Sequence, residues 1–120
     1  MSSVVLLVED DLALREVMVE ALQMEGIVTS FAANGAEAMS YLRCSPPPKL
    51  ILLDLMMPVM DGAQFRVAQR ADPSFCGIPV VLLSADRELA DKAWALQVDA
   101  WLRKPVDLEE LMETVRRYTR

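Results

Sequence analysis

The sequence predicts an α/β fold in which a doubly wound, five-stranded parallel sheet carries helices on both faces. Along its 120 residues, short runs of leucine and β-branched residues alternate with segments of helical periodicity. Three of those runs are wholly apolar, as expected for strands that are buried on both faces. No repeat, low-complexity tract or linker interrupts the alternation, so we expect a single domain over residues 1–120.

Two strand–helix pairs are expected in the first half of the chain. Val4–Val8 predicts the first strand. The helix expected over Asp11–Glu25 repeats apolar residues at helical spacing, and Gly26 follows as its stop. Ile27–Phe31 predicts a second strand and Ala36–Leu42 a short helix, after which three consecutive prolines impose an extended connection.

The third and fourth strands are also wholly apolar runs, Leu50–Leu53 and Val80–Leu83. A helix is expected between them, beginning near Asp61 or Gly62, because an aspartate there can cap its first turn. This helix ends before Pro73, since the residue before a proline disfavours helical geometry.

The last part of the chain predicts two helices around one short strand. Arg87–Gln97 has helical character, and Ala100–Arg103 follows as the fifth strand. Asp107 can cap the final helix, with Glu110 three residues further on. One face of this helix is expected to be apolar and to carry Leu108, Leu111, Met112 and Val115.

Parallel strands joined by right-handed helical crossovers predict a flavodoxin-like sheet of order 2-1-3-4-5. Such sheets place their chemistry beyond the carboxyl ends of the strands, at the topological switch point. Polar or charged residues follow four of the predicted strands at that edge: Glu9, Asp10, Asp11, Asp54, Ser84 and Lys104. We therefore expect these side chains to surround one pocket.

Composition excludes several classes of function. A net charge of −6 disfavours direct nucleic-acid binding, and the absence of histidine removes Ser-His-Asp triads and most zinc or copper sites. The apolar runs are too short to span a bilayer and no secretory signal is visible. Cys44 and Cys76 have no metal-like spacing, and we expect both to be reduced in a cytoplasmic protein.

The cluster of acids at the predicted edge favours a bound cation. Several crowded carboxylates repel one another and raise a pKa unless a positive charge offsets them. Only oxygen ligands are at hand, and Mg²⁺ fits a site with few protein carboxylates better than a Ca²⁺ cage does. Lys104 adds a charge that can hold an anion. A carboxylate nucleophile, Mg²⁺, a hydroxyl and a lysine together suit phosphoryl transfer to Asp54.

Four segments in order, VLLVEDD, LILLDLMMPVMDG, VVLLSA and AWLRKP, resemble the motifs of the CheY-like receiver domain of two-component response regulators. The resemblance covers essentially the whole chain. It implies that Asp54 accepts a phosphoryl group from the phosphohistidine of a sensor histidine kinase or phosphotransfer protein. It further implies that Glu9, Asp10, Asp54 and the backbone carbonyl of Met56 arrange Mg²⁺, with Glu9 acting through water.

The resemblance also implies a conformational switch. Ser84 takes the place of the family's switch hydroxyl and Lys104 that of its phosphate-binding lysine, with a cis Lys104–Pro105 bond. Trp101 stands at the aromatic switch position, where the family usually has tyrosine or phenylalanine. Two interpretations of Trp101 remain open, a switch residue or simple core packing. For Trp94, a partner-contact residue and a half-buried one are equally compatible with the sequence.

Other conspicuous residues have structural explanations. Asp11 is expected to cap the first helix, with electrostatic support of the metal as the alternative role, and Met18, Met39 and Met112 are expected to fill the core.

The function predicted from these features is a phosphorylation-activated switch, not an enzyme with an external substrate. Phosphorylation would reshape the surface of the fourth helix, fifth strand and fifth helix, which a downstream effector reads. Because Met56 is apolar and cannot orient an attacking water, we expect slow autodephosphorylation. Two alternatives are a Mg²⁺-dependent aspartyl-phosphate phosphatase, although Met56 occupies the place of its second acid, and an inactive receiver-like interaction module.

Overall fold

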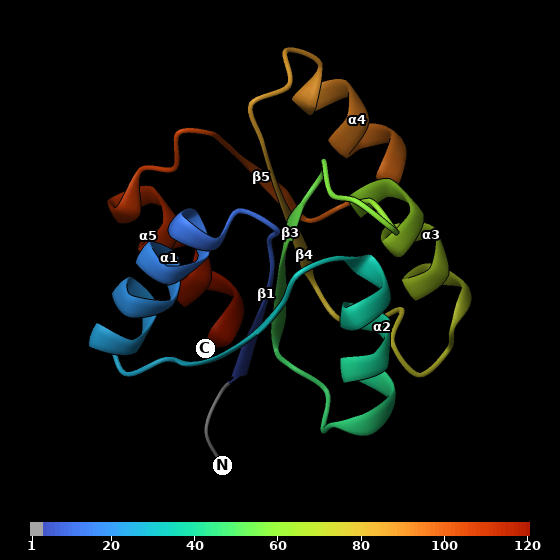
Figure 1. Ribbon diagram of the computed structural model, residues 1–120, viewed down its shortest axis with the longest axis horizontal. Helices are drawn as coiled ribbons and strands as arrows, with labels where there is room; N and C mark the ends of the chain where they lie inside the picture. Colours follow the sequence, from blue (N-terminus) through green and yellow to red (C-terminus); the bar gives the residue numbers. More distant parts are fainter. Residues whose placement is uncertain (1–3) are drawn as a thin grey trace.

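The computed structural model describes residues 4–120, so the first three residues of the predicted domain lie outside the described part. Strands and helices alternate as predicted (Figure 1). The strands are β1 (Val4–Val8), β2 (Val28–Ala32), β3 (Leu50–Asp54), β4 (Val80–Ser84) and β5 (Ala100–Arg103). The helices are α1 (Leu12–Met24), α2 (Gly35–Cys44), α3 (Gly62–Ala71), α4 (Leu89–Leu96) and α5 (Leu108–Thr119).

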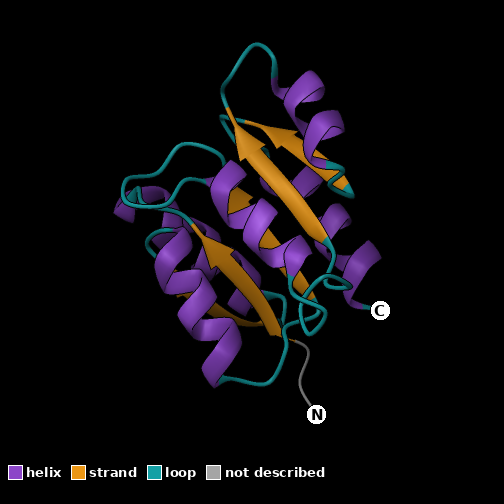
Figure 2. Cartoon of the chain, turned by 90° about the vertical axis from the view of Figure 1, so that its right-hand side faces the viewer, coloured by secondary structure: helices purple, strands orange, loops and turns teal. Residues whose placement is uncertain are grey.

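All five strands pair in parallel in the order β2-β1-β3-β4-β5, which confirms the predicted flavodoxin-like topology. The arrows in Figure 2 run in one common direction. Because β1 pairs with both β2 and β3, the order reverses beside β1, and the ends of β1 and β3 lie next to each other at that switch point.

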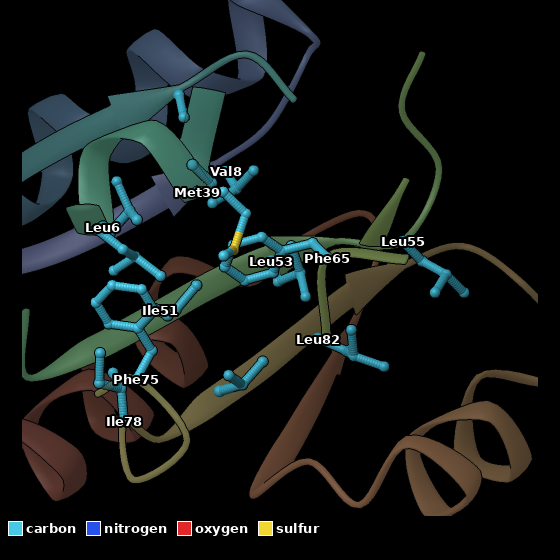
Figure 3. Close-up of a cluster of buried hydrophobic side chains, with 14 of the residues drawn as sticks. Leu6, Val8, Met39, Ile51, Leu53, Leu55, Phe65, Phe75, Ile78 and Leu82 are labelled. Atoms are coloured by element: carbon cyan, nitrogen blue, oxygen red, sulfur yellow. The ribbon is translucent and has the colours of Figure 1, made fainter. Parts of the chain in front are cut away.

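Helices cover both faces of the sheet and enclose two separate cores. Figure 1 shows α1 and α5 on one face and α2, α3 and α4 on the other. Side chains of a strand point alternately to opposite faces, so Leu6 and Leu53 belong to the core under α2 to α4, whereas Leu7 and Leu52 pack under α1 and α5. In the larger core, Met39 and Phe65 lie close to Leu53 (Figure 3). The central strands are therefore anchored on both faces.

Aspartate caps fix the starts of three helices, as predicted. The side chains of Asp11 and Asp107 accept hydrogen bonds from the first-turn amides of α1 and α5, and Asp61 forms a reciprocal capping box with Gln64. Gly62 allows α3 to approach β3 closely, since a Cβ there would lie 2.4 Å from the carbonyl oxygen of Asp54. The loop after Asp54 is thereby held against its own strand.

Two details of the prediction were wrong. The fourth helix begins at Leu89 rather than Arg87, because the Asp86 side chain accepts the amide of Glu88 and holds residues 87–88 in a turn. Leu108 is 42 % exposed, because the inward face of α5 begins only one turn later, at Leu111, and includes the buried Thr114.

Other predicted core positions are confirmed. Met18, Met39 and Met112 are buried as predicted. Among residues 4–120, no helix has the length and apolar character needed to cross a membrane.

Candidate functional site

The carboxyl ends of four strands surround a cavity of about 430 Å³. Parallel pairing brings these ends together, since Asp54 is in register with Leu83 on β4, and Ser84 with Arg103 on β5. The cavity contains every polar residue that was predicted for this edge. Its lining consists of Glu9, Asp10, Asp11, Asp54, Met56, Ser84, Ala85, Asp86 and Lys104.

Three carboxyl groups converge in this cavity. Glu9 and Asp10 directly follow β1, and Asp54 ends the neighbouring strand β3. One oxygen from each lies within 4.8 Å of the others. Glu9 and Asp54 are buried, whereas Asp10 is exposed at the mouth. The arrangement concentrates negative charge at one point that remains open to solvent on one side.

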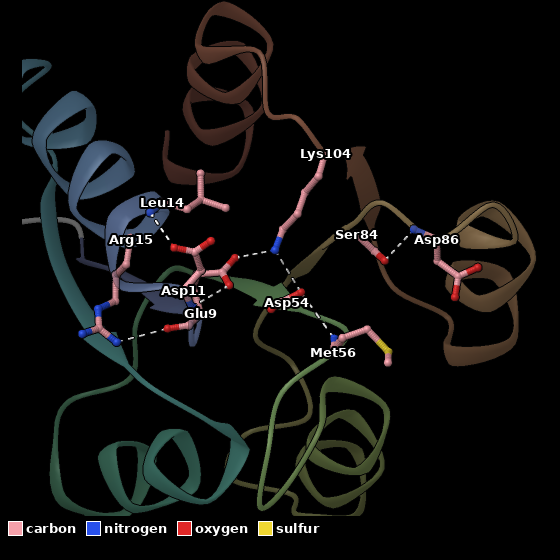
Figure 4. A network of polar contacts seen from close by, with 9 residues as sticks. All are labelled: Glu9, Asp11, Leu14, Arg15, Asp54, Met56, Ser84, Asp86 and Lys104. Carbon is pink, nitrogen blue, oxygen red and sulfur yellow. Dashed lines mark hydrogen bonds and ion pairs between the residues drawn. The ribbon is translucent and has the colours of Figure 1, made fainter.

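Lys104 reaches into the same cavity and contacts two of the acids (Figure 4). Its Nζ lies 2.8 Å from Glu9 Oε1 and 3.2 Å from Asp54 Oδ1. The Lys104 backbone amide donates a 2.9 Å hydrogen bond to the carbonyl of Ser84, which continues the pairing of β4 and β5 beyond their ends. The Lys104–Pro105 bond is cis, as the resemblance implied.

One lysine does not neutralise two buried acids. Burial raises the pKa of Asp54, and the nearby Glu9 carboxyl raises it further, to about 7, although Lys104 acts in the opposite direction. Burial alone would lower the pKa of Lys104, but its contacts with Glu9 and Asp54 outweigh that effect and raise its pKa. Lys104 alone therefore leaves Asp54 partly protonated near neutral pH.

The donor set fits a hard divalent cation. Glu9 Oε1 is buried, and its partner is the Lys104 ammonium, 2.8 Å away. The three acids supply only oxygen ligands, which Mg²⁺ prefers. Met56, whose carbonyl was predicted as a ligand, lines the cavity, and its amide donates to Asp54 Oδ1 at 3.3 Å. The residues present are thus chemically suited to Mg²⁺.

Ser84 lies in the cavity, but its hydroxyl is directed away from the acids. Its Oγ accepts a 3.0 Å hydrogen bond from the backbone amide of Asp86 (Figure 4). Asp86 was not among the predicted site residues. The only signal for it was an acid two residues after the serine, just before a predicted helix, where a capping role is the ordinary explanation.

Residues near the acids are held by local hydrogen bonds. Asp11 accepts the amide of Leu14 at 3.1 Å, so its predicted capping role is confirmed. Its own amide donates to Glu9 Oε2 at 3.2 Å. Arg15, which sequence reasoning overlooked, donates to the Glu9 carbonyl and stacks over Phe31 at 4.6 Å. These contacts fix the end of β1 and hence the position of Glu9.

Both tryptophans lie at the surface outside this cavity. Trp101 is 46 % exposed and Trp94 is 85 % exposed, and together they line a separate hollow between α4 and β5. The interpretation of Trp101 as a simple core residue is therefore wrong, as is that of Trp94 as a half-buried one.

The fold and this cavity are those of a receiver module of two-component signalling, and comparison with known proteins agrees. Residues 5–116 match the response regulator receiver domain family, and the chain belongs to that family. The sequence-based resemblance and the predicted fold are both confirmed.

Individual members of this family are similar to the chain in sequence or in structure. It is 40 % identical over 114 residues to response regulator Rre1 of Synechocystis, covering 92 % of this chain and 49 % of Rre1. It is 35 % identical to the DNA-binding response regulator MtrA of Mycobacterium tuberculosis, covering 93 % and 48 %. The chain spans about half the length of these curated relatives. The chemotaxis response regulator CheY4 of Vibrio cholerae superposes with a TM-score of 0.89 at 29 % identity, over 98 % of this chain and 99 % of CheY4.

Proposed function

We propose that this receiver domain is a phosphorylation-activated switch in which Asp54 accepts a phosphoryl group from the phosphohistidine of a sensor kinase or phosphotransfer protein. The observation that carries the proposal is the placement of Lys104 Nζ 3.2 Å from Asp54 Oδ1 in a solvent-connected cavity. A nucleophilic carboxylate beside a fixed cation is the minimum that attack on an anionic phosphoryl group requires.

The chemical step is an in-line displacement at phosphorus. A carboxylate oxygen of Asp54 forms the new bond as the bond to the donor's nitrogen breaks, and the nitrogen keeps the electron pair. Lys104 holds the negative charge that spreads over the phosphoryl oxygens. Mg²⁺ held by the acid cluster would supply further positive charge to the site. Asp54 must be ionised to attack, and a cation in the acid cluster lowers its raised pKa.

Four groups of this chain would hold the metal: the carboxylates of Glu9, Asp10 and Asp54 and the backbone carbonyl of Met56. Glu9 is assigned a contact through water, as the family resemblance implies, and its pairing with Lys104 is compatible with that assignment. The buried Glu9 Oε1, whose partner is the Lys104 ammonium, and the exposed position of Asp10 both support a site that binds the ion together with several waters.

The output is a change in the surface formed by α4, β5 and α5. A phosphoryl group adds charge and acceptor oxygens, which Lys104 and Ser84 satisfy only if the Ser84 hydroxyl turns toward Asp54. The aromatic side chain of Trp101 then moves toward the space that Ser84 leaves. A downstream effector protein or domain in the cytoplasm reads this surface, without direct nucleic-acid contact by this acidic chain. The similarity of this chain to MtrA, a DNA-binding response regulator, supports a linked effector as the reader of this surface.

Hydrolysis of the acyl phosphate resets the switch. Met56 is 67 % exposed at the cavity and has no group that orients an attacking water. We therefore assign the phosphorylated state a lifetime well beyond seconds. The same apolar residue disfavours the alternative of a phosphatase for external esters, and the close approach of three acids disfavours an inactive module.

Treatment with acetyl phosphate tests the proposal. Intact-mass spectrometry of the protein should show the gain of one phosphoryl group with Mg²⁺ and none with a chelator. Modification that is independent of Mg²⁺ would contradict the proposed site. Turnover of a panel of phosphate esters would instead favour the phosphatase.

A further inference from the structure

The hydrogen bond between Ser84 and Asp86 keeps the Ser84 hydroxyl on the side of its own loop. Ser84 is buried, and its Oγ accepts the Asp86 amide at 3.0 Å (Figure 4). Rotation of Ser84 toward Asp54 carries Oγ away from this amide. The loop between β4 and α4 must then follow the hydroxyl, or the hydrogen bond is lost.

Two cations restrain Asp86 from elements outside this loop. The Lys92 ammonium, on the first turns of α4, forms an ion pair with the Asp86 carboxylate. The Arg103 guanidinium, on β5, donates a 2.7 Å hydrogen bond to the Asp86 carbonyl. The hydrogen bond from Lys92, and next that from the Glu88 amide, lower the pKa of Asp86. Asp86 is thus tied to two of the three elements of the proposed output surface, α4 and β5.

The opposite end of α4 is fixed by a buried clamp. Arg66 of α3 is 6 % exposed and donates to the carbonyls of Leu96 and Gln97, where α4 ends. Gln69 accepts a further hydrogen bond from Arg66 at 2.7 Å. Arg70 donates to the Gln97 side chain. Since a buried hydrogen-bonded guanidinium is costly to displace, this end of α4 is the fixed one.

We propose that Asp86 is a positioning residue that holds Ser84 turned away from Asp54, and that Lys92 and Arg103 set the strength of this restraint. The inference rests on the proposed function. When Ser84 turns toward a phosphoryl group, Asp86 and the N-terminal end of α4 shift, while the Arg66 clamp acts as the pivot. The restraint couples the cavity to the α4–β5 surface in both directions, as two-state linkage requires.

The test compares Lys92→Gln and Arg103→Gln with wild type and with Arg117→Gln. The control removes the same charge from an exposed ion pair with Glu113 on α5. The measurement is the initial rate of Asp54 phosphorylation by subsaturating acetyl phosphate with Mg²⁺. Loss of a cation near the cavity by itself slows attack on an anionic donor. A faster rate therefore has the opposite sign to a simple charge effect.

We expect each variant to be phosphorylated about two- to fivefold faster than wild type, since surface ion pairs bias an equilibrium modestly. Arg117→Gln should match wild type. Without donor, amide hydrogen exchange should accelerate over residues 86–92 in Lys92→Gln, and not at residues 96–98, where the Arg66 clamp is intact.

Three results would count against the inference, and only the third would also contradict the proposed function. Faster exchange with an unchanged or lower phosphorylation rate would show a purely structural contact and overturn it. Variants no faster than Arg117→Gln, with wild type phosphorylated normally, would overturn it and leave the proposed function intact. Absence of phosphorylation in wild type would contradict the proposed function itself, and this inference with it.

Discussion

Glu9 and Lys104 form an ion pair at the base of the cavity, with Oε1 and Nζ 2.8 Å apart. Glu9 is fully buried, whereas the Lys104 side chain is 21 % exposed. Removal of one partner leaves the other charge buried without compensation, which is more costly than the pair itself.

We therefore expect Lys104→Met to lower the free energy of unfolding at pH 8 by about 2 kcal/mol, below the range for fully buried pairs because Lys104 retains some solvent contact. Urea denaturation without Mg²⁺ measures this change. Lys49→Met, at an exposed lysine, is the control and should change stability little. Equal stability of wild type and Lys104→Met would mean that the pair does not hold in solution.

Asp54→Asn should stabilise the metal-free protein at pH 8 by about 1–3 kcal/mol. The pKa of Asp54 is about 7 in the folded protein and about 4 when unfolded, so the protonated carboxyl favours folding. This contribution is fully present below about pH 4 and is lost as the pH rises through about 7. The advantage of the variant should therefore shrink below pH 7 and vanish near pH 4. Chemical denaturation with a chelator at pH 5, 6, 7 and 8 measures it, and a less stable variant at pH 8 would refute the assignment.

Val59 is strained and should be replaceable with a gain in stability. It has a φ of 70°, which places a β-branched residue in the unfavourable left-handed region. Its side chain is 83 % exposed, so burial of apolar surface does not offset this cost. We expect Val59→Gly to raise the unfolding free energy by about 1 kcal/mol. Val67→Gly, at another exposed valine but within α3, should lower it by a similar amount. Thermal denaturation of both variants measures these changes. A lower stability of Val59→Gly would contradict the proposed backbone strain at Val59.

Mg²⁺ binding should depend on Asp10 and on pH. We expect Asp10→Asn to weaken Mg²⁺ affinity about tenfold or more, because it removes a carboxylate from the cluster. Glu20→Gln, which removes an exposed acid from α1, should have no comparable effect. Affinity should also fall as the pH drops through about 7, since Asp54 must lose its proton to bind the ion. Isothermal titration calorimetry with Mg²⁺ measures both effects, and equal affinity in Asp10→Asn would place the ion elsewhere.

The sequence was sufficient to predict the fold and most of the cavity because strand ends follow a simple rule. Apolar runs locate the strands, parallel topology places their carboxyl ends together, and Asp54 and Lys104 directly follow such runs. The sequence contains no comparable pattern that predicts the hydrogen bond that restrains Ser84 or the Arg66 clamp. Arg66 donates to Leu96 across 30 residues, and a side chain bonded to a distant carbonyl leaves no periodic pattern. The exposure of Trp101 was equally unpredictable, because a tryptophan side chain on an edge strand can be either buried or exposed to solvent.

The location of the phosphoryl group tests the central claim most directly. After reaction with acetyl phosphate and Mg²⁺, borohydride reduction converts an aspartyl phosphate to homoserine, which peptide mass spectrometry identifies by position. We expect homoserine at residue 54 in wild type and at no aspartate in Asp54→Asn. Homoserine at Asp10 or Asp86 in wild type, or an unmodified residue 54, would contradict the account.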